Sequence, residues 1–180
     1  HAYSLIHDDL PCMDNDKLRR GKPTAHIVYG ESTAVLAGNS LLTLAFEILS
    51  DEEFKISNNV KNQLINLISK CSGHTGVAGG QYLDLNYEKK NVSKKKIIDM
   101  QIKKTGMLFS FCCVAPVILA KKNNLVKRKF QSLGNEIGLL FQISDDLIDL
   151  KGKTRDAGKV TGKDKKKGKA TLIGLLGYEN

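Results

Sequence analysis

The sequence predicts an all-α protein organised as one domain over residues 1–180. Apolar residues recur at helical spacing along most of the chain, one segment is apolar on almost all sides, and no stretch shows a convincing period of two. A chain of 180 residues buries roughly 70% of the surface that it exposes when unfolded, so one core is the default. Because the chain starts without Met and stops just after a Leu-Leu-Gly typical of a helix interior, we expect a fragment.

The first long helix is expected over residues 33–49, where apolar side chains cover almost every side. A helix of this kind belongs at the centre of a large helical domain, so we expect it to be buried. A second helix is expected over residues 60–71, because its apolar residues fall on one face from Val60 and Leu64 onward. Ser57 precedes this helix as a plausible N-cap.

Two further helices follow in the second half of the chain. Ser93 can cap a helix that runs toward the apolar stretch 107–120, where Pro116 would kink or end it. This stretch is shorter than the ~20 residues that a membrane-spanning helix needs, so we expect a buried core helix and no stable membrane insertion. Apolar spacing over residues 130–141 predicts one long amphipathic helix.

The formal charge of +9 raises nucleic acid, anionic membranes and phosphorylated small molecules as partners. Much of the excess lies in the Lys-rich stretch 151–169, which a solvated surface explains. The four cysteines show no metal-binding spacing, and two of them are adjacent. This pattern suits neither a zinc site nor a disulfide framework, and it favours a reducing, cytoplasmic location.

Two groups of aspartates stand out. Asp145 and Asp149 are four residues apart on a predicted helix, so both carboxylates leave the same face. Asp8 and Asp14 are six apart, but Pro11 disrupts a helix there, and the chain can bulge to bring Asp14 back beside Asp8. Carboxylates without interleaved His or Cys suit Mg²⁺. Two such groups facing each other across a cavity would bind a metal-diphosphate from both sides.

A lone Asp-Asp pair more often belongs to a solvated surface or a helix end. Here basic and polar residues accompany both groups, namely Arg19, Arg20, Lys104 with Thr105, Lys159 and Lys169. Cations and a multivalent metal that converge on one point indicate a highly charged anion, and a diphosphate fits.

Residues 1–24 resemble the first aspartate-rich motif of farnesyl and geranylgeranyl diphosphate synthases, in the bacterial and plant form with a Pro-Cys insertion. Residues 141–149, Phe-Gln-Ile-Ser-Asp-Asp-Leu-Ile-Asp, resemble the second. Between them, residues 79–85 and 104–106 are similar to the intermediate motifs in order and spacing. The resemblance to short-chain trans-polyprenyl diphosphate synthases covers essentially the whole chain. It implies a helical bundle of the isoprenoid synthase type around a central cavity, here without its N- and C-terminal helices.

This resemblance also implies a Mg²⁺-dependent prenyltransferase that joins isopentenyl diphosphate to dimethylallyl or geranyl diphosphate, in a protein that is usually a homodimer. Metal ligation falls to Asp8, Asp14 and Asp145, with Asp9 and Asp149 in supporting roles. The resemblance further implies that Arg19, Lys159 and Lys169 bind the allylic diphosphate and that Arg20 binds isopentenyl diphosphate. Along the allylic substrate it implies three residues, which are also the implied catalytic residues: Lys104, Thr105 and Gln142.

Product length is expected to depend on residues just before the first aspartates. Ser4 lies one turn before Asp8, and Tyr3 precedes it, so both can line the tunnel for the growing chain. In the family a large aromatic here tends to stop elongation early, which favours the farnesyl product. Geranylgeranyl diphosphate is the alternative product, and Tyr3 can instead face another helix.

The sequence also bears on three alternative functions. A non-catalytic regulatory homologue commonly loses one aspartate group, whereas both are present here. A helical terpene cyclase would lack the paired arginines after the first group. A nucleic-acid-binding protein could use the lysines of residues 151–169, but this function leaves the aspartates unexplained, and we expect no nucleic acid as partner.

Overall fold

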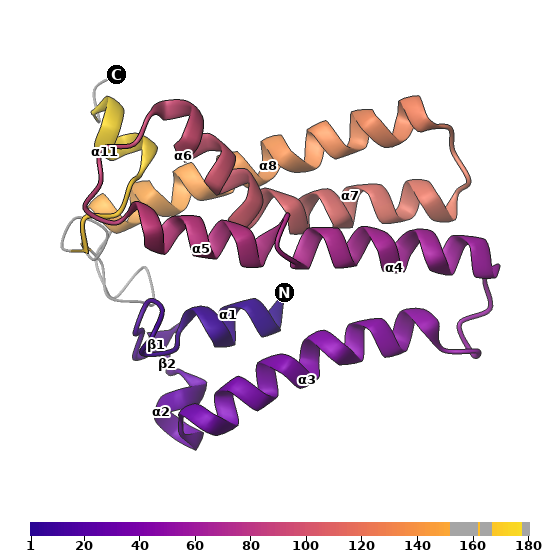
Figure 1. The fold of residues 1–180 in the computed structure, drawn as a ribbon, viewed down its shortest axis with the longest axis horizontal. Coiled ribbons are helices and arrows are strands. Elements are labelled where there is room, and N and C mark those ends of the chain that lie inside the picture. Colours follow the sequence, from indigo (N-terminus) through magenta and orange to yellow (C-terminus); the bar gives the residue numbers. More distant parts are fainter. Residues whose placement is uncertain (152–161, 163–166, 178–180) are drawn as a thin grey trace. The chain divides into compact units, whose positions relative to one another are not determined.

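The computed structural model describes residues 1–151, 162 and 167–177. Regular structure in these residues is almost entirely helical, which confirms the predicted fold class (Figure 1). Contacts group the chain into two compact units, one of residues 1–54 and 148–163, the other of residues 55–147 and 164–180. The single domain expected over residues 1–180 stays a prediction.

Residues 1–54 of the first unit form three helices and a short hairpin. In chain order these are α1 (Ala2–Asp8), β1 (Leu18–Arg19), β2 (Lys22–Pro23), α2 (Ala25–Tyr29) and α3 (Glu31–Ser50). Helix α3 lies against both α1 and α2. The contact with α1 is close, because a Cβ atom on Gly38 would overlap the His7 imidazole. The His7 ring also anchors α1, since its Nε2 lies 3.1 Å from the carbonyl oxygen of Val35.

The hairpin corrects the expectation that the chain contains no sheet. Strands β1 and β2 are antiparallel, with Leu18 opposite Pro23 and Arg19 opposite Lys22. The turn residues Arg20 and Gly21 have φ values of 53° and 75°, and positive φ at both positions is typical of a type I′ hairpin turn. Strands of two residues are too short to show an alternating pattern, so apolar periodicity does not reveal them.

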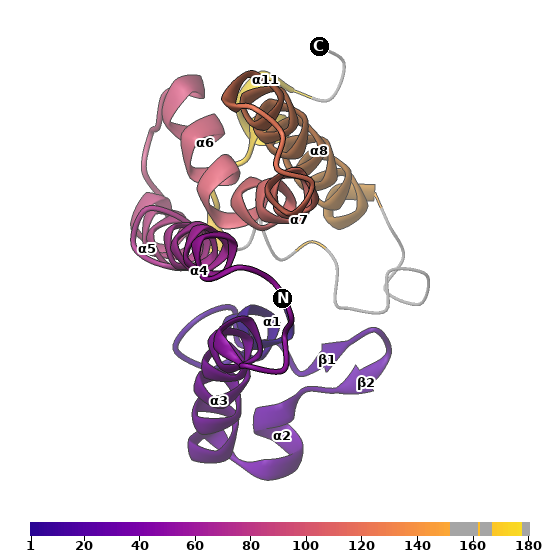
Figure 2. The same ribbon diagram turned by 90° about the vertical axis from the view of Figure 1, so that its right-hand side faces the viewer.

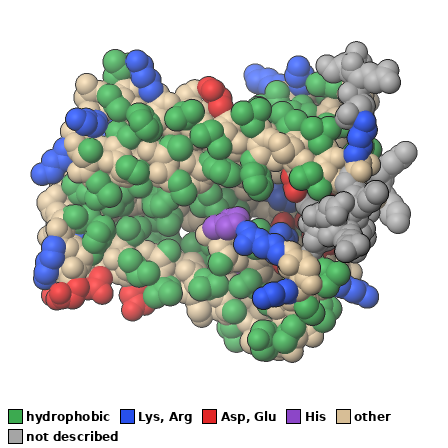
Figure 3. All heavy atoms as spheres, turned by 180° about the vertical axis from the view of Figure 1, so that it is seen from behind, with side chains coloured by type: hydrophobic (Ala, Val, Ile, Leu, Met, Phe, Trp, Pro, Cys, Tyr) green, Lys and Arg blue, Asp and Glu red, His purple; other side chains and the backbone are tan. Residues whose placement is uncertain are grey.

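Helix α3 forms where a helix was predicted, but its expected burial is wrong. Among its residues Ala34 and Gly38 are buried, whereas Leu36 is 64% exposed and Ile48 is 56% exposed. The main neighbours of α3 in its unit are the short helices α1 and α2, and these cover one side of it. On the face that Figure 3 shows, hydrophobic side chains (green) are widely exposed.

Regular structure in the described residues of the second unit is entirely helical. It contains α4 (Asn58–Ser72), α5 (Val77–Tyr87), α6 (Lys94–Gln101), the π-helix η1 (Ile102–Gly106), α7 (Met107–Leu119), most of α8 (Asn124–Lys151) and α11 (Leu172–Leu176). Ser57 and Ser93 occupy the N-cap positions of α4 and α6, as predicted. Pro116 lies inside α7, which ends three residues later. Helices α7 and α8 run side by side in opposite directions (Figures 1 and 2).

Two apolar contacts form the core of this unit. The first joins α4 to α7 through buried side chains that include Leu64 and Val114. The second gathers the end of the described chain onto α6, and its buried members are Val92, Ile97, Met100, Ala170 and Leu172. This second contact holds residues 167–172 beside α5 and α6.

Two helical stretches, Glu31–Ser50 and Lys94–Leu119, are long and apolar enough to cross a membrane. The expectation was that no apolar stretch reaches the length of a membrane span. It considered only unbroken apolar runs, whereas these two helices also include a few polar residues. Length and composition do not separate a membrane span from a core helix of a helical protein, so the absence of membrane insertion stays a prediction.

Thiol chemistry provides a first test of this packing. Cys71 is fully buried, and burial together with the neighbouring Cys112 raises its pKa to about 11. Cys12 is exposed and provides the control. At pH 8 a thiol with a pKa of about 11 instead of 9.0 has a thiolate fraction about 100-fold lower. We expect iodoacetamide to alkylate Cys12 at least that much faster than Cys71, as followed by peptide mass spectrometry; equal rates would contradict the packing of α4.

Candidate active site

The first aspartate group surrounds the end of α1. This helix ends at Asp8, as Pro11 predicts, and the chain then bulges back on itself. The Asp14 N–H donates to the Asp8 carbonyl oxygen at 2.8 Å, and the Asp16 N–H donates to that of Asp9 at 3.1 Å. The predicted return of Asp14 to the neighbourhood of Asp8 is therefore confirmed for the backbone.

Arg19 of β1 is held by the same loop. Its Nε donates to both carboxylate oxygens of Asp9 at 2.9 and 2.8 Å, and its Nη2 donates to Oδ1 at 2.6 Å. Burial alone would lower the pKa of Arg19, but the bond and charge of Asp9, followed by the charges of Asp8 and Asp14, raise it. Because both oxygens of the buried Asp9 accept from Arg19, its geometry favours holding the arginine over binding a metal. Arg20 lies next to it in the hairpin turn.

In the second unit, two of the predicted site residues, one on η1 and one on α8, form a hydrogen bond. Thr105 Oγ1 donates to Gln142 Oε1 at 3.0 Å, and Gln142 Nε2 donates to Asp146 Oδ1 at 2.9 Å. Gln101 Nε2 donates to the other oxygen of Asp146 at 3.1 Å. Asp146 therefore orients the Gln142 amide, a role that the sequence did not indicate. Lys104 is the remaining predicted residue on η1, and its contacts are described below.

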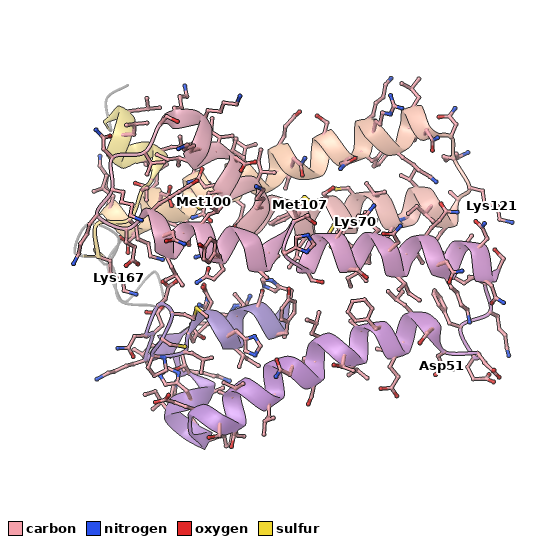
Figure 4. All side chains as sticks on the ribbon, viewed as in Figure 1. Asp51, Lys70, Met100, Met107, Lys121 and Lys167 are labelled. Atoms are coloured by element: carbon pink, nitrogen blue, oxygen red, sulfur yellow. The ribbon has the colours of Figure 1, made fainter. Side chains whose placement is uncertain are left out.

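The π-turn η1 lies between Met100 and Met107, which Figure 4 labels. Single π-turns of this kind interrupt α-helices mostly at functional sites. Two glycines allow neighbouring helices to approach this turn: a Cβ atom on Gly80 of α5 would overlap the Lys104 backbone, and one on Gly138 of α8 would overlap Gly106. Glycines inside helices cost stability, so their presence at these positions is a sign of close packing that the sequence itself contains.

Lys104 and Lys169 both bind one carboxylate. Asp84 Oδ2 accepts from Lys104 Nζ at 2.7 Å and from Lys169 Nζ at 2.9 Å. Burial alone would raise the pKa of Asp84, but Lys104 and then Lys169 outweigh it and hold this pKa below its usual range. Asp84 lies in the motif 79–85 that carried part of the resemblance, although no role was predicted for it.

The remaining predicted residues are placed as follows. Asp145 and Asp149 both lie on α8, one helical turn apart. Tyr3 and Ser4 lie on α1, where the Tyr3 ring meets His7 edge-on and Ser4 Oγ donates to the His1 carbonyl oxygen at 2.9 Å. Lys159 lies outside the described residues. The roles assigned to all these residues from the resemblance stay predictions.

The donor set fits magnesium. Among the described residues no three His, Cys, Asp or Glu side chains converge as a group that could hold a metal ion. Mg²⁺ needs no such cage, because one or two carboxylates usually bind it together with water and substrate phosphate. Asp8, Asp14 and Asp145 offer hard oxygen ligands only, which suits this ion better than zinc.

Comparisons with known proteins agree with the resemblance. The polyprenyl synthetase family model matches residues 1–180. Farnesyl diphosphate synthase of Bacillus subtilis is 41% identical over 180 residues, which are 99% of this chain and 61% of that protein. Geranylgeranyl pyrophosphate synthase 4 of Arabidopsis thaliana is 39% identical over 99% of this chain and 48% of its own length. The chain thus spans about three-fifths of the bacterial relative.

Solved structures show the same fold. The geranyltransferase of Helicobacter pylori, complexed with magnesium and isoprenyl diphosphate, has a TM-score of 0.91 and 37% identity over 99% of this chain and 58% of that one. An FPP/GFPP synthase of Zymomonas mobilis has a TM-score of 0.86 and 44% identity over 99% of this chain and 60% of that one. The chain therefore belongs to the polyprenyl synthetase family.

Proposed function

We propose that this chain is the catalytic part of a short-chain prenyl diphosphate synthase that joins isopentenyl diphosphate to an allylic diphosphate. The observation that carries the proposal is the arrangement of side chains on η1. Thr105 is hydrogen-bonded to Gln142, and the adjacent Lys104 shares the Asp84 carboxylate with Lys169. Fixed cations beside fixed neutral dipoles suit a reaction that separates a diphosphate from a carbocation.

The chain's own residues divide the work in this proposal. Lys104, Lys169 and Arg19 bind oxygens of the allylic diphosphate, and charge-assisted hydrogen bonds to them strengthen as the leaving group gains charge. The Thr105 and Gln142 dipoles stabilise the allylic cation without trapping it as a covalent adduct. The double bond of isopentenyl diphosphate then attacks, and a proton is lost to the released diphosphate.

Magnesium completes the proposed site. Asp8, Asp14 and Asp145 would hold it, with Asp149 in a supporting role, and the bound ion would neutralise charge on the leaving diphosphate. We further propose that both aspartate groups serve one diphosphate, and that the protein acts as a cytoplasmic homodimer. Both groups are present, which favours a catalyst over a regulatory homologue.

Farnesyl diphosphate is the proposed product and geranylgeranyl diphosphate the alternative, since relatives of both names match the chain. The test is to incubate the complete protein with Mg²⁺, isopentenyl diphosphate and starters of increasing length, and to identify the prenyl products by chromatography. Condensation with dimethylallyl or geranyl diphosphate supports the proposal. No product from any starter would favour the regulatory homologue.

Chain length should respond to Tyr3. This residue lies on α1 five residues before Asp8, and in this proposal its ring closes the tunnel for the growing chain. We expect Tyr3→Ala in the complete enzyme to shift the main product from fifteen to twenty carbons, as measured by chromatography of the dephosphorylated prenols. Ser4→Ala removes no bulk and serves as the control. An unchanged farnesyl product would exclude Tyr3 as the stop.

A further inference from the structure

Asp84 is buried at the meeting point of three parts of the second unit. It lies on α5 and is 5% exposed. Its Oδ2 binds Lys104 of η1 and Lys169, which precedes α11, at 2.7 and 2.9 Å. Two ammonium groups from distant parts of the chain are thereby fixed on a single oxygen atom.

The backbone around Asp84 is built to hold both lysines. Gly80 lies one turn before Asp84 on the same face of α5, and its lack of a side chain lets α5 contact the Lys104 backbone. On the other side, the Lys89 N–H just beyond α5 donates to the Gly168 carbonyl oxygen at 2.7 Å, directly before Lys169. Each lysine is therefore anchored to α5 by its backbone surroundings as well as by its side chain.

Electrostatics alone would not bring these lysines together. Two ammonium groups repel each other, and each stands on a flexible four-carbon chain whose ordering costs entropy. A shared carboxylate offsets both costs and still leaves one net positive charge. Because Lys104 and Lys169 hold the pKa of Asp84 below its usual range, this carboxylate is ionised at neutral pH.

We propose that Asp84 is a positioning residue that holds the Lys104 and Lys169 ammonium groups as a fixed pair, so that both bind the same diphosphate group. The inference rests on the proposed function, because it takes the allylic diphosphate as the ligand of these lysines. Asp84 itself touches no substrate in this arrangement and acts only through the two lysines.

Binding of inorganic diphosphate separates positioning from simple charge. Asp84→Asn raises the net charge of the cluster from +1 to +2, so electrostatics alone would tighten diphosphate binding. Positioning predicts the opposite sign, because the released lysines repel each other and lose their common geometry. We expect Asp84→Asn to weaken binding of magnesium diphosphate about tenfold in titration calorimetry of the complete protein.

Steady-state kinetics give a second readout. For Asp84→Asn we expect a higher KM for the allylic diphosphate and a lower kcat, with the KM for isopentenyl diphosphate unchanged. Asp99→Asn is the matched control, because it removes the same charge from an exposed pair, 2.8 Å long, with Lys103 on the neighbouring turn. The control should leave diphosphate affinity and both KM values within twofold of the unchanged protein.

The inference is overturned if Asp84→Asn binds diphosphate as tightly as the unchanged protein or tighter, or if Asp99→Asn produces the same loss. Should Asp84→Asn fail to fold, Asp84→Glu provides the test, since it keeps the charge but displaces it by one methylene; affinity equal to that of the unchanged protein would then refute positioning. A protein that binds diphosphate as expected yet condenses no substrate would contradict the proposed function while supporting the lysine pair.

Discussion

Replacement of Asp8 by Asn in the complete enzyme should lower kcat for condensation about 10³-fold, the upper end of what one preorganised electrostatic group contributes. Asn is nearly the same size, and the backbone bond from the Asp14 N–H to the Asp8 carbonyl oxygen does not involve the side chain. The loop should therefore keep its shape while the carboxylate charge is lost. The rate is measured as radiolabelled isopentenyl diphosphate incorporated into product.

A readout besides activity distinguishes a metal ligand from a structural residue. We expect Asp8→Asn to weaken binding of Mn²⁺, as a paramagnetic substitute for Mg²⁺, when diphosphate is present. Asp51→Asn, an exposed carboxylate after α3, should change neither metal binding nor rate. Addition of EDTA should abolish condensation by the unchanged protein, and excess Mg²⁺ should restore it. Full activity of Asp8→Asn would remove this residue from the site.

Local signals explain why the helices were predictable. Ser57 and Ser93 occupy the N-cap positions of α4 and α6, and a serine directly before an apolar periodic stretch is a local sign that a helix begins there. The bulge after α1 was predictable for the same reason, since Pro11 acts on its immediate neighbours. In each case the cause and its effect lie within one or two turns of chain.

The features that the sequence did not indicate depend on distant partners. Asp84 and Lys169 are separated by most of the second unit, and no spacing rule connects them. The burial of α3 was wrongly predicted for a related reason, because periodicity shows which sides of a helix are apolar but not which neighbours cover them. The family resemblance predicted Lys104 and Lys169 as site residues, whereas the carboxylate that they share, Asp84, is evident only in the structure.

Replacement of Gly138 by Ala should destabilise the protein by about 1–3 kcal/mol, the usual cost of forcing extra volume into a packed interior. A methyl group at this position would overlap the Gly106 backbone, so α8 must move away from η1. Separation of these elements would also stretch the bond from Thr105 to Gln142, so activity should fall along with stability. Stability is measured by urea unfolding followed by circular dichroism.

The same substitution on the other side of this contact, Gly106→Ala on η1, is the matched control. A Cβ atom on Gly106 would have its nearest neighbours at 3.5 Å, which is ordinary van der Waals distance. Because alanine is the better helix former by about 1 kcal/mol, this variant should be as stable as the unchanged protein or slightly more stable. Opposite outcomes for two identical substitutions would show that α8 contacts η1 through Gly138; equal destabilisation would show that this contact is not as close as the structure places it.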